Sequence, residues 1–303
     1  MRVLMSGAGG FIGSALAAAL AGAGHEVVRL TRGAGAPPSP SVIPWDPARG
    51  VLDASHLGAL DAAVHLSGKN IAAFPWTPAH EKEVWESRVQ STRLLAETLA
   101  RLERPPRVLV CASGTGYYGD RGDEVLTEEA GPGRGFLADL CVAWEGAAEP
   151  ATAAGVRVVP LRLAMVLDRS GGALPRMLPA FRLGLGAWMG SGRQYTGWIS
   201  LADAVGVMQH ALGVESVRGP VNAVAPEPVT SRDFARALAR ALGRPAFLSA
   251  PAVVLRLAAG KLGEASLWSV RAVPARLQAT GYDFRYPELD GALRAALARP
   301  PAG

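Results

Sequence analysis

The chain has 303 residues, 49% of them hydrophobic, and a formal net charge of +5. This length and composition suffice for one large domain or two with a buried core, and no apolar run reaches the roughly 18 residues of a membrane-spanning helix. The excess charge is small and scattered, which argues against nucleic-acid binding. Two cysteines are too few for a disulfide framework or a cysteine-based zinc site, so we expect a cytoplasmic protein without a bound metal.

The chain opens with a short apolar run that stops at glycines spaced Gly7-x-x-Gly10-x-x-Gly13, and a helical pattern follows at once. Strand, glycine turn and helix in this order predict a dinucleotide site, because glycines let the backbone approach the pyrophosphate and the helix N-terminus offers unpaired N–H donors. The repeated glycines argue against the alternative, a secretory signal peptide. We therefore predict that a cofactor contacts Gly7, Gly10, Phe11, Ile12 and Gly13.

A second strand is expected at 27–30, and Arg32 follows its carboxyl end, where a Rossmann fold meets the adenosine ribose. An acidic residue there favours NAD, whereas an arginine accommodates the 2′-phosphate of NADP, and no acid occurs between Glu26 and Asp46. Arg32 therefore predicts NADP(H), unless it is simply a surface arginine. A third strand is expected to end at Asp46, which we also place near the cofactor.

The fourth strand is expected to end at Leu66 and to run into Ser67 and Gly68. Because ligands bind at the carboxyl ends of parallel strands, these three residues are predicted cofactor contacts, and Lys69 is a candidate cation at the nicotinamide end. His65 is better explained as a histidine with partners inside the sheet than as a catalytic group, since its neighbours are apolar and strand-forming.

The remaining elements are a long helix from 77 or 78 to 99, a strand at 107–111, a helix from 136 to about 154, and a strand at 156–162. Six strands that alternate with helices predict a parallel, doubly wound sheet of the α/β Rossmann class. We expect this NADP(H)-binding domain to span 1–170, with 198–224 returning to it. A smaller, mainly helical, substrate-facing lobe is expected from 171–197 and 225–303. Within the returning segment, a helix is expected to begin at 198.

These motifs resemble the extended short-chain dehydrogenase/reductase superfamily, also described as the NAD-dependent epimerase/dehydratase superfamily. The resemblance rests on the glycine turn, His65-Leu66-Ser67-Gly68, Arg162 and the run at 198–203. More narrowly, the segments 113–119, 141–145, 171–175 and 281–287 resemble the atypical YfcH-like epimerase family. The resemblance implies a nucleotide-sugar-type epimerase or an oxidoreductase, with Arg162 near the cofactor.

The superfamily's Tyr-x-x-x-Lys pair is absent from this chain. Cys141-x-x-x-Glu145 stands at its place, and this spacing puts both side chains on one helix face. A thiol is a stronger acid than a phenol, so Cys141 could donate a proton, although a neighbouring carboxylate weakens it as an acid. Alternatively, Cys141 is a small buried helix residue, while Glu145 could accept hydrogen bonds from ribose hydroxyls.

Four further residues are candidates for contact with a substrate. Ser113 matches the superfamily's substrate-polarising serine, with Thr115 beside it, although both could instead only shape a turn. Tyr117 could supply the missing phenol, although aromatic packing is its more usual role. Arg193 matches the region where superfamily members meet a substrate phosphate or carboxylate, and a guanidinium suits that task.

Two functions fit these residues. The first is an NADP(H)-dependent epimerase or oxidoreductase that acts on a small carbonyl or sugar-like substrate at Ser113, Tyr117, Cys141, Glu145 and Arg193. The second is a protein that binds or senses NADP(H) without hydride chemistry, which the missing Tyr-Lys pair favours. In either case we expect a small-molecule ligand, no nucleic-acid or membrane partner, and a monomer or homodimer.

Overall fold

The structure is a computed structural model that describes residues 1–33, 39–71, 73 and 76–298. Its contacts cluster into two compact units. Unit 1 comprises Met1–Ser113, Leu140–Leu161 and Val205–Val221, and unit 2 comprises Gly114–Asp139, Arg162–Ala204 and Asn222–Gly303. The two units alternate more finely along the chain than the predicted lobes, whose boundaries were expected at 170, 197 and 224. The functions assigned to the two predicted lobes therefore remain predictions.

A mostly parallel sheet carries unit 1. Within the described residues it has eight strands, in the order β14 (Val221–Ala223), β8 (Arg157–Leu163), β6 (Val108–Gly114), β5 (Ala62–His65), β1 (Arg2–Ser6), β2 (Glu26–Arg32), β3 (Val42–Asp46) and β4 (Val51–Leu52). The pairs from β3 through β2, β1 and β5 to β6 are parallel, and only the short β4 is known to run antiparallel to its neighbour β3. All six predicted strands are present in this sheet.

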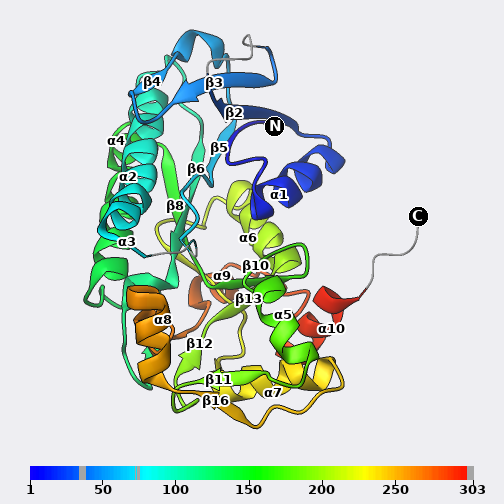
Figure 1. The fold of residues 1–303 in the computed structure, drawn as a ribbon. Coiled ribbons are helices and arrows are strands. Elements are labelled where there is room, and N and C mark those ends of the chain that lie inside the picture. Colours follow the sequence, from blue (N-terminus) through cyan, green and yellow to red (C-terminus); the bar gives the residue numbers. More distant parts are fainter. Residues whose placement is uncertain (34–38, 72, 74–75, 299–303) are drawn as a thin grey trace. The chain divides into compact units, whose positions relative to one another are not determined.

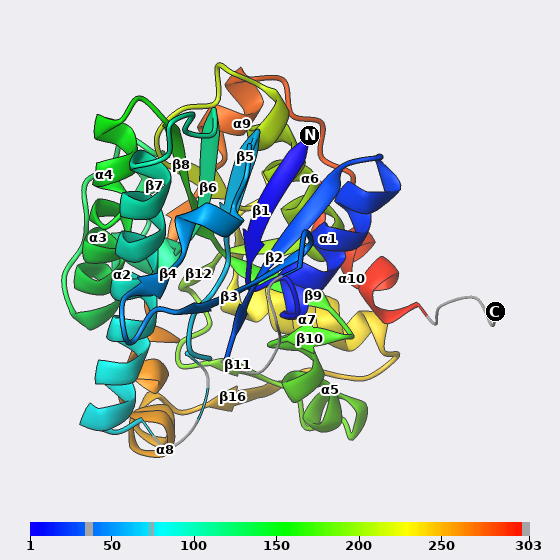
Figure 2. The same ribbon diagram turned by 90° about the horizontal axis from the view of Figure 1, so that it is seen from above.

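Helices cover both faces of the sheet (Figure 1). On one face lie α2 (Pro78–Ala100) and α4 (Glu149–Ala153), whose apolar side chains share a buried cluster with the strands. On the other face lie α1 (Phe11–Gly22) and α6 (Leu201–Gly213). Figure 2 shows β1, β5, β6 and β8 side by side between these layers. This is the doubly wound Rossmann arrangement that the alternation of strands and helices predicts.

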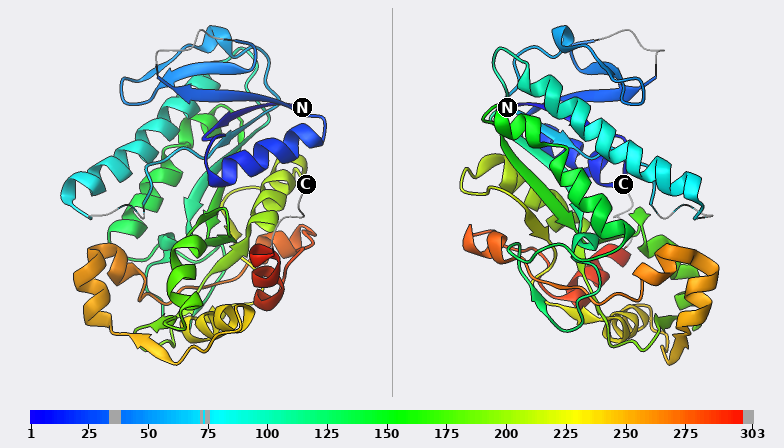
Figure 3. Two further views of the ribbon diagram at one scale, coloured as in Figure 1. Left: turned by 45° about the vertical axis from the view of Figure 1, so that its right-hand side comes forward. Right: turned by 90° about the vertical axis from the view of Figure 1, so that its left-hand side faces the viewer.

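The single helix predicted from 136 to about 154 is wrong: the segment forms α3 (Phe136–Gly146) and the separate α4. Pro150 explains the break, because it has no N–H to donate to the carbonyl of Gly146 and its ring would collide with that carbonyl in a continuous helix. Figure 3 shows α2 running beside α3 and α4. A side-chain bond joins α3 to α2, because Trp144 Nε1 donates to Thr92 Oγ1 at 2.9 Å.

Unit 2 consists of shorter elements. Its strands are β7 (Val125–Leu126), β9 (Met165–Asp168), β10 (Gly171–Gly172), β11 (Ala187–Met189), β12 (Tyr195–Thr196), β13 (Trp198–Ser200), β15 (Val229–Thr230), β16 (Leu248–Ala250) and β17 (Arg271–Ala272). Its helices are α5 (Leu174–Arg182), α7 (Ser231–Ala241), α8 (Ala252–Ala265), α9 (Ala275–Ala279) and α10 (Leu289–Leu297). Short 3₁₀ segments occur at Ala54–His56 in unit 1 and at Thr115–Tyr118 in unit 2. The main core of unit 2 packs α5, α7 and α10 against β13.

The helix expected to begin at 198 begins instead at Leu201, because 198–200 form β13, which pairs with β9. Thr230 is the N-cap of α7, since its Oγ1 accepts the N–H of Asp233 at 3.2 Å. Across the described part of the chain, no helix is both long and apolar enough to span a membrane.

Candidate active site

The strand order reverses at β1, whose neighbours are β2 and β5. Ser6, the last residue of β1, is in register with His65, the last residue of β5. Open parallel sheets bind ligands at the carboxyl ends of strands where the order reverses. Gly7 and Leu66 follow directly on these two strand ends, so the structure brings these predicted cofactor residues together.

The glycine turn packs tightly at two positions. Gly7 has φ +72°, and a Cβ there would lie 2.8 Å from the backbone C and O atoms of Leu66. A Cβ on Gly13 would lie 2.0 Å from the carbonyl oxygen of Gly7. Gly10 N closes the turn by donating to Gly7 O at 2.9 Å. Side chains at these positions would push apart the strand, the turn and α1.

The start of α1 offers backbone donors to an anion. Gly10 is the N-cap residue without a side-chain cap, and the first turn of α1 contains no acid. Gly9 and Gly10 are exposed, and a Cβ on Gly9 would meet no atom within 4 Å. Unpaired N–H groups, the positive end of the helix dipole and an open approach fit the pyrophosphate of a dinucleotide. Phe11 and Ile12 begin this helix and are half-buried beside the turn.

Arg32 and Asp46 end the neighbouring strands β2 and β3. Arg32 is exposed and in register with Trp45. Asp46 Oδ1 accepts the N–H groups of Ala48 at 3.1 Å and Arg49 at 3.2 Å, so it closes a turn after β3. The position of Arg32 suits a ligand phosphate, whereas Asp46 already has structural partners. Both roles at the cofactor remain predictions.

His65 is fully buried and has a partner at each ring nitrogen. Its Nδ1 lies 2.6 Å from Ser6 Oγ and its Nε2 lies 3.1 Å from Ser91 Oγ. The edge of Trp45 packs against it, with ring centroids 6.0 Å apart. Burial lowers the pKa of His65 to about 3, so the ring is neutral at physiological pH. The prediction of a histidine satisfied inside the sheet is confirmed.

Ser113 and Glu145 form a hydrogen-bonded pair. Ser113, near the end of β6, is 4% exposed, and its Oγ donates to Glu145 Oε1 on α3 at 2.7 Å. A hydrogen bond to a carboxylate is stronger than one between neutral groups. The structure thus brings together two predicted catalytic residues, one from the sheet and one from the helix beside it.

The two cysteines have different surroundings. Cys141 lies one turn before Glu145 on α3, and Cys111 lies two residues before Ser113 on β6. Burial, together with the nearby Glu145 carboxylate, raises the pKa of Cys111 to about 12. Cys111 is therefore a protonated core residue at neutral pH. Cys141 is also buried, but α2 places a cation beside it.

That cation is Arg88, which the sequence predictions missed. Its side chain is 8% exposed, and its guanidinium carbon lies 5.0 Å from the ring centroid of Trp144 on α3. Burial lowers the pKa of Arg88 to about 10, and the charge at Cys141 raises it, so Arg88 is a cation at neutral pH. A Cβ on Gly68 would lie 3.2 Å from the guanidinium carbon, which gives this predicted cofactor residue a packing role.

The sequence does contain a signal for Arg88. Val84, Arg88 and Thr92 are spaced four residues apart, and Leu95 and Leu99 continue the same stripe. The residues of this stripe are buried. An arginine on the apolar stripe of an amphipathic helix is unusual, because such a charge must find partners on burial. The stripe could have distinguished Arg88 from the surface arginines.

Lys69, the candidate cation at the nicotinamide end, forms an ion pair at the surface. Its Nζ lies 2.7 Å from Glu83 Oε2, and both side chains are exposed. In unit 2, Arg193 is exposed on a loop, where its N–H donates to Ser191 Oγ at 3.2 Å. Thr115 begins the 3₁₀ turn after β6. Substrate contacts by Lys69, Thr115 and Arg193 remain predictions.

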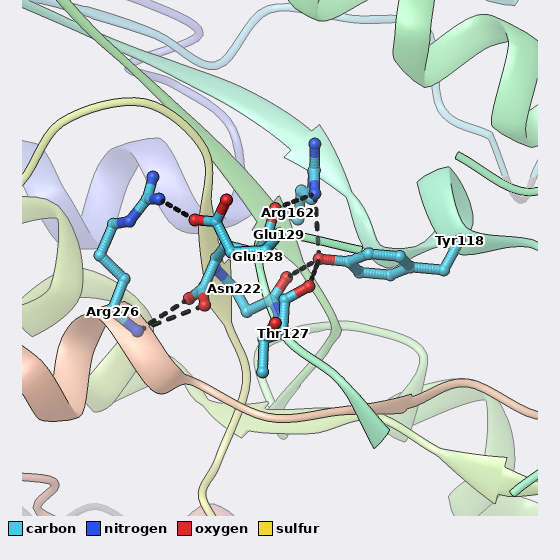
Figure 4. Close-up of polar contacts among 7 residues, drawn as sticks. All are labelled: Tyr118, Thr127, Glu128, Glu129, Arg162, Asn222 and Arg276. Atoms are coloured by element: carbon cyan, nitrogen blue, oxygen red, sulfur yellow. Dashed lines mark hydrogen bonds and ion pairs between the residues drawn. The ribbon is translucent and has the colours of Figure 1, made fainter. Parts of the chain in front are cut away.

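Arg162 belongs to a buried polar network in unit 2 (Figure 4). Its guanidinium lies 3.4 Å from the ring centroid of Tyr117, and its Nη1 donates to Tyr118 Oη at 3.0 Å. Tyr118 Oη also lies 2.6 Å from Asn222 Oδ1. Glu128 accepts the N–H groups of Asn222 and Arg276.

This network gives two predicted site residues structural partners. Arg162 holds the aromatic pair Tyr117 and Tyr118, whose rings pack edge to face with centroids 5.3 Å apart. Burial raises the pKa of Tyr118, although Arg162 opposes this shift. Aromatic packing therefore accounts for the position of Tyr117. A catalytic role for Tyr117 and a cofactor contact by Arg162 remain predictions.

Unit 2 also contains a pocket of about 730 Å³, a size typical of small-molecule sites. Its lining combines the aromatic side chains of Phe136 and Trp268 with basic and acidic ones, namely Arg121, Arg134, Lys261, Asp120 and Glu264. Arg134 is exposed, and Lys261 Nζ lies 5.4 Å from the ring centroid of Phe136. Such a lining suits a ligand that has both an apolar part and polar groups.

The strand order and the glycine turn define a Rossmann-fold protein of the short-chain dehydrogenase/reductase class. Residues 3–222 match the model of the NAD dependent epimerase/dehydratase family, and residues 250–296 match a domain of unknown function, DUF1731. The chain belongs to the NAD dependent epimerase/dehydratase family. The resemblance inferred from the motifs is thereby confirmed.

Individual relatives and solved structures support this assignment. Epimerase family protein Mb2239 of Mycobacterium bovis is 42% identical over 299 residues, which cover 98% of each chain. The crystal structure of human epimerase family protein SDR39U1 with NADPH has a TM-score of 0.88 and 37% identity, over 98% of this chain and 99% of that one. A nucleoside-diphosphate sugar epimerase from Corynebacterium glutamicum has a TM-score of 0.80 and 33% identity, over 98% of this chain and 58% of that one.

Proposed function

We propose that this protein is an NADP(H)-dependent oxidoreductase or epimerase that acts on a small carbonyl or sugar-like substrate. The observation that carries the proposal is the 2.7 Å hydrogen bond between Ser113 and Glu145 at the carboxyl end of β6. It places a hydroxyl and a carboxylate beside the strand ends where a Rossmann fold binds its ligands. Membership of the epimerase/dehydratase family supports the same reading.

The residues of unit 1 fit a dinucleotide. Gly7, Gly10 and the start of α1 would hold the pyrophosphate, and the loop at 66–68 would lie toward the nicotinamide. Arg32 would hold the 2′-phosphate, so the cofactor is NADP(H) rather than NAD(H). The relative SDR39U1, solved with NADPH, supports this choice. When bound, the nicotinamide supplies or accepts a hydride.

The proposed catalytic roles follow from the hydrogen-bond capacities of the side chains. Ser113 turns its hydroxyl from Glu145 to the substrate oxygen and polarises it. Glu145 then accepts a hydrogen bond from a hydroxyl of the cofactor ribose or the substrate. Cys141, one turn earlier on the same helix face, is the candidate proton donor.

The proposal is tested by measuring NADPH consumption with a panel of carbonyl compounds that includes nucleotide sugars. We expect turnover of at least one compound, and Ser113→Ala should lower kcat/KM about 100-fold or more. Ser55→Ala is the matched control, because Ser55 Oγ also donates to a carboxylate, Asp53, at 2.7 Å but at the surface. No turnover across the panel, or equal effects of the two substitutions, would contradict the proposal.

A second function is favoured by the same hydrogen bond. The single hydroxyl proton of Ser113 is directed at Glu145 rather than toward a substrate. This arrangement fits a protein that binds or senses NADP(H) without hydride chemistry, because such a protein does not need a hydroxyl directed at a substrate. It would be stabilised by NADPH through mass action, and Cys141→Ala would leave that stabilisation unchanged. Turnover that is lost in Cys141→Ala would exclude this alternative.

A further inference from the structure

The helices α2 and α3 are joined at Trp144. Its Nε1 donates to Thr92 Oγ1 at 2.9 Å, and Arg88 stacks on the same indole ring at 5.0 Å. Arg88 and Thr92 are one turn apart on α2, and Cys141 and Trp144 are one turn apart on α3. The guanidinium therefore lies on the side of α3 that carries Cys141, which accounts for the electrostatic effect of Cys141 on Arg88.

Among the described residues, no acidic side chain forms a salt bridge with the buried Arg88, whose hydrogen bonds go to carbonyl groups. Its Nη1 donates to two neutral groups, the carbonyls of Lys69 at 3.0 Å and Val84 at 3.2 Å. Burying a cation costs free energy, because the charge loses its water. An anion nearby, or hydrogen-bond acceptors for its N–H groups, must offset that cost. This arrangement favours an anion close to the guanidinium.

We propose that Arg88 is a positioning residue for Cys141: it supplies from α2 the positive charge that a lysine supplies in the superfamily, and Cys141 is the proton donor to the substrate oxygen. This inference rests on the proposed oxidoreductase or epimerase function. It replaces the tyrosine and lysine of one helix with a thiol on α3 and a guanidinium on α2. Arg88 acts through Cys141 and does not itself contact the substrate.

The proton transfer balances without any further reactant. The S–H bond of Cys141 breaks, the proton goes to the negatively charged substrate oxygen, and the electron pair stays on sulfur as a thiolate. Arg88 stabilises that thiolate. A proton from solvent restores the thiol, and the reverse direction uses the thiolate as the base. The oxidation state of sulfur does not change.

Among the described residues, Arg88 interacts electrostatically with Cys141, and Glu145 lies one turn after Cys141 on α3. Arg88 on α2 favours the thiolate, whereas Glu145 on α3 disfavours it. Cys111 on β6 is uncharged at neutral pH, since burial and Glu145 raise its pKa to about 12. The titration of Cys141 is therefore set by opposed charges from two helices. Removal of either charge should move the titration in a predictable direction.

The test follows thiolate absorbance in the ultraviolet as a function of pH, in full-length protein that carries Cys111→Ala and contains no cofactor or substrate. Cys141→Ser in the same background gives the baseline. We expect Arg88→Gln to raise the titration midpoint by about one pH unit or more, as loss of an adjacent opposite charge does. Arg88→Lys, which keeps the charge, should stay closer to the parent, and Glu145→Gln should lower the midpoint.

An unchanged midpoint in a folded Arg88→Gln protein would overturn the proposal, because a purely structural arginine does not alter the acidity of a thiol. If Arg88→Gln fails to fold by circular dichroism, Arg88→Met takes its place, since it keeps an unbranched stem against Trp144 and removes the charge. The titration needs no turnover. A shifted midpoint in a protein without NADPH-dependent activity would therefore contradict the proposed function and still establish the Arg88–Cys141 pair.

Discussion

Unit 1 contains buried polar residues whose protonation and hydrogen bonds are fixed by a few neighbours. Ser113, His65 and Arg88 are each less than a tenth exposed, yet each has partners that determine its state. Ser113 donates to a carboxylate, His65 is held neutral between two hydroxyls, and Arg88 remains charged against an indole ring. Burial makes each state sensitive to the loss of one partner.

His65 predicts a specific loss of stability in acid. Its pKa is about 3 in the folded protein and 6.5 as the ordinary value, so below about pH 6.5 the unfolded chain binds a proton that the folded chain does not. Stability should therefore fall as the pH drops from about 6.5 toward 3, by up to about 1.4 kcal/mol per pH unit. Urea unfolding at pH 7, 6 and 5 measures this slope.

The comparison variants are His65→Asn and His56→Asn. The first removes the buried ring and should flatten the slope, whereas the second changes an exposed histidine and should leave it as in the parent protein. The same slope in the parent and in His65→Asn would show that other groups cause the acid sensitivity.

At the scale of elements, the contact between α2 and α3 determines where the candidate catalytic residues lie. Pro150 in the first turn of α4 separates this helix from α3, and the bond from Trp144 to Thr92 fixes α3 against α2. The carboxylate of Glu145 then reaches Ser113 on β6. The position of Glu145 beside Ser113 thus depends on the packing of α3 against α2.

Thr92→Val should destabilise the protein by about 1–3 kcal/mol, because it leaves the buried indole N–H of Trp144 without an acceptor. Thr98→Val is the control on the same helix, since the hydroxyl of Thr98 donates to the carbonyl of Leu94 one turn earlier on α2 itself. Urea unfolding measures both variants. Equal losses of stability would mean that the bond between the helices contributes nothing beyond the loss of a buried hydroxyl.

Gly13→Ala tests the junction of β1 and α1. The added Cβ would lie 2.0 Å from Gly7 O, so the turn or the helix must move. We expect NADPH binding to weaken about tenfold or more, about 1.4 kcal/mol, as measured by calorimetry. Gly22→Ala at the other end of α1 meets no atom within 4 Å and should bind like the parent protein. Unaltered binding in Gly13→Ala would remove the turn from the cofactor site.

For the whole molecule, the sequence patterns predicted the sheet and the glycine turn because both depend on neighbours along the chain. Apolar runs and the spacing of Gly7, Gly10 and Gly13 are local signals. Pro150 is also a local signal for the break between α3 and α4, but the apolar pattern continues across it and predicted a single helix. The pair of Ser113 and Glu145 is separated by 32 residues, and only the packing of α3 on β6 brings it together.

Arg88 shows the same limit more clearly. Its helix was predicted, but its stacking partner Trp144 lies on another helix whose placement no local pattern gives. The network of Arg162, Tyr118 and Asn222 likewise joins distant segments of unit 2. Local patterns thus predict the elements and the cofactor turn, whereas the partners of buried polar groups require the tertiary structure.

The glycine turn and Arg32 are proposed to bind NADP(H) together. Calorimetric titration with NADPH and NADH, on the parent protein and on Arg32→Glu, tests it most directly. We predict that the parent binds NADPH more tightly than NADH, and that Arg32→Glu loses this preference because the carboxylate repels the 2′-phosphate. Equal affinity of the parent protein for NADPH and NADH, or no binding of either, would contradict the claim.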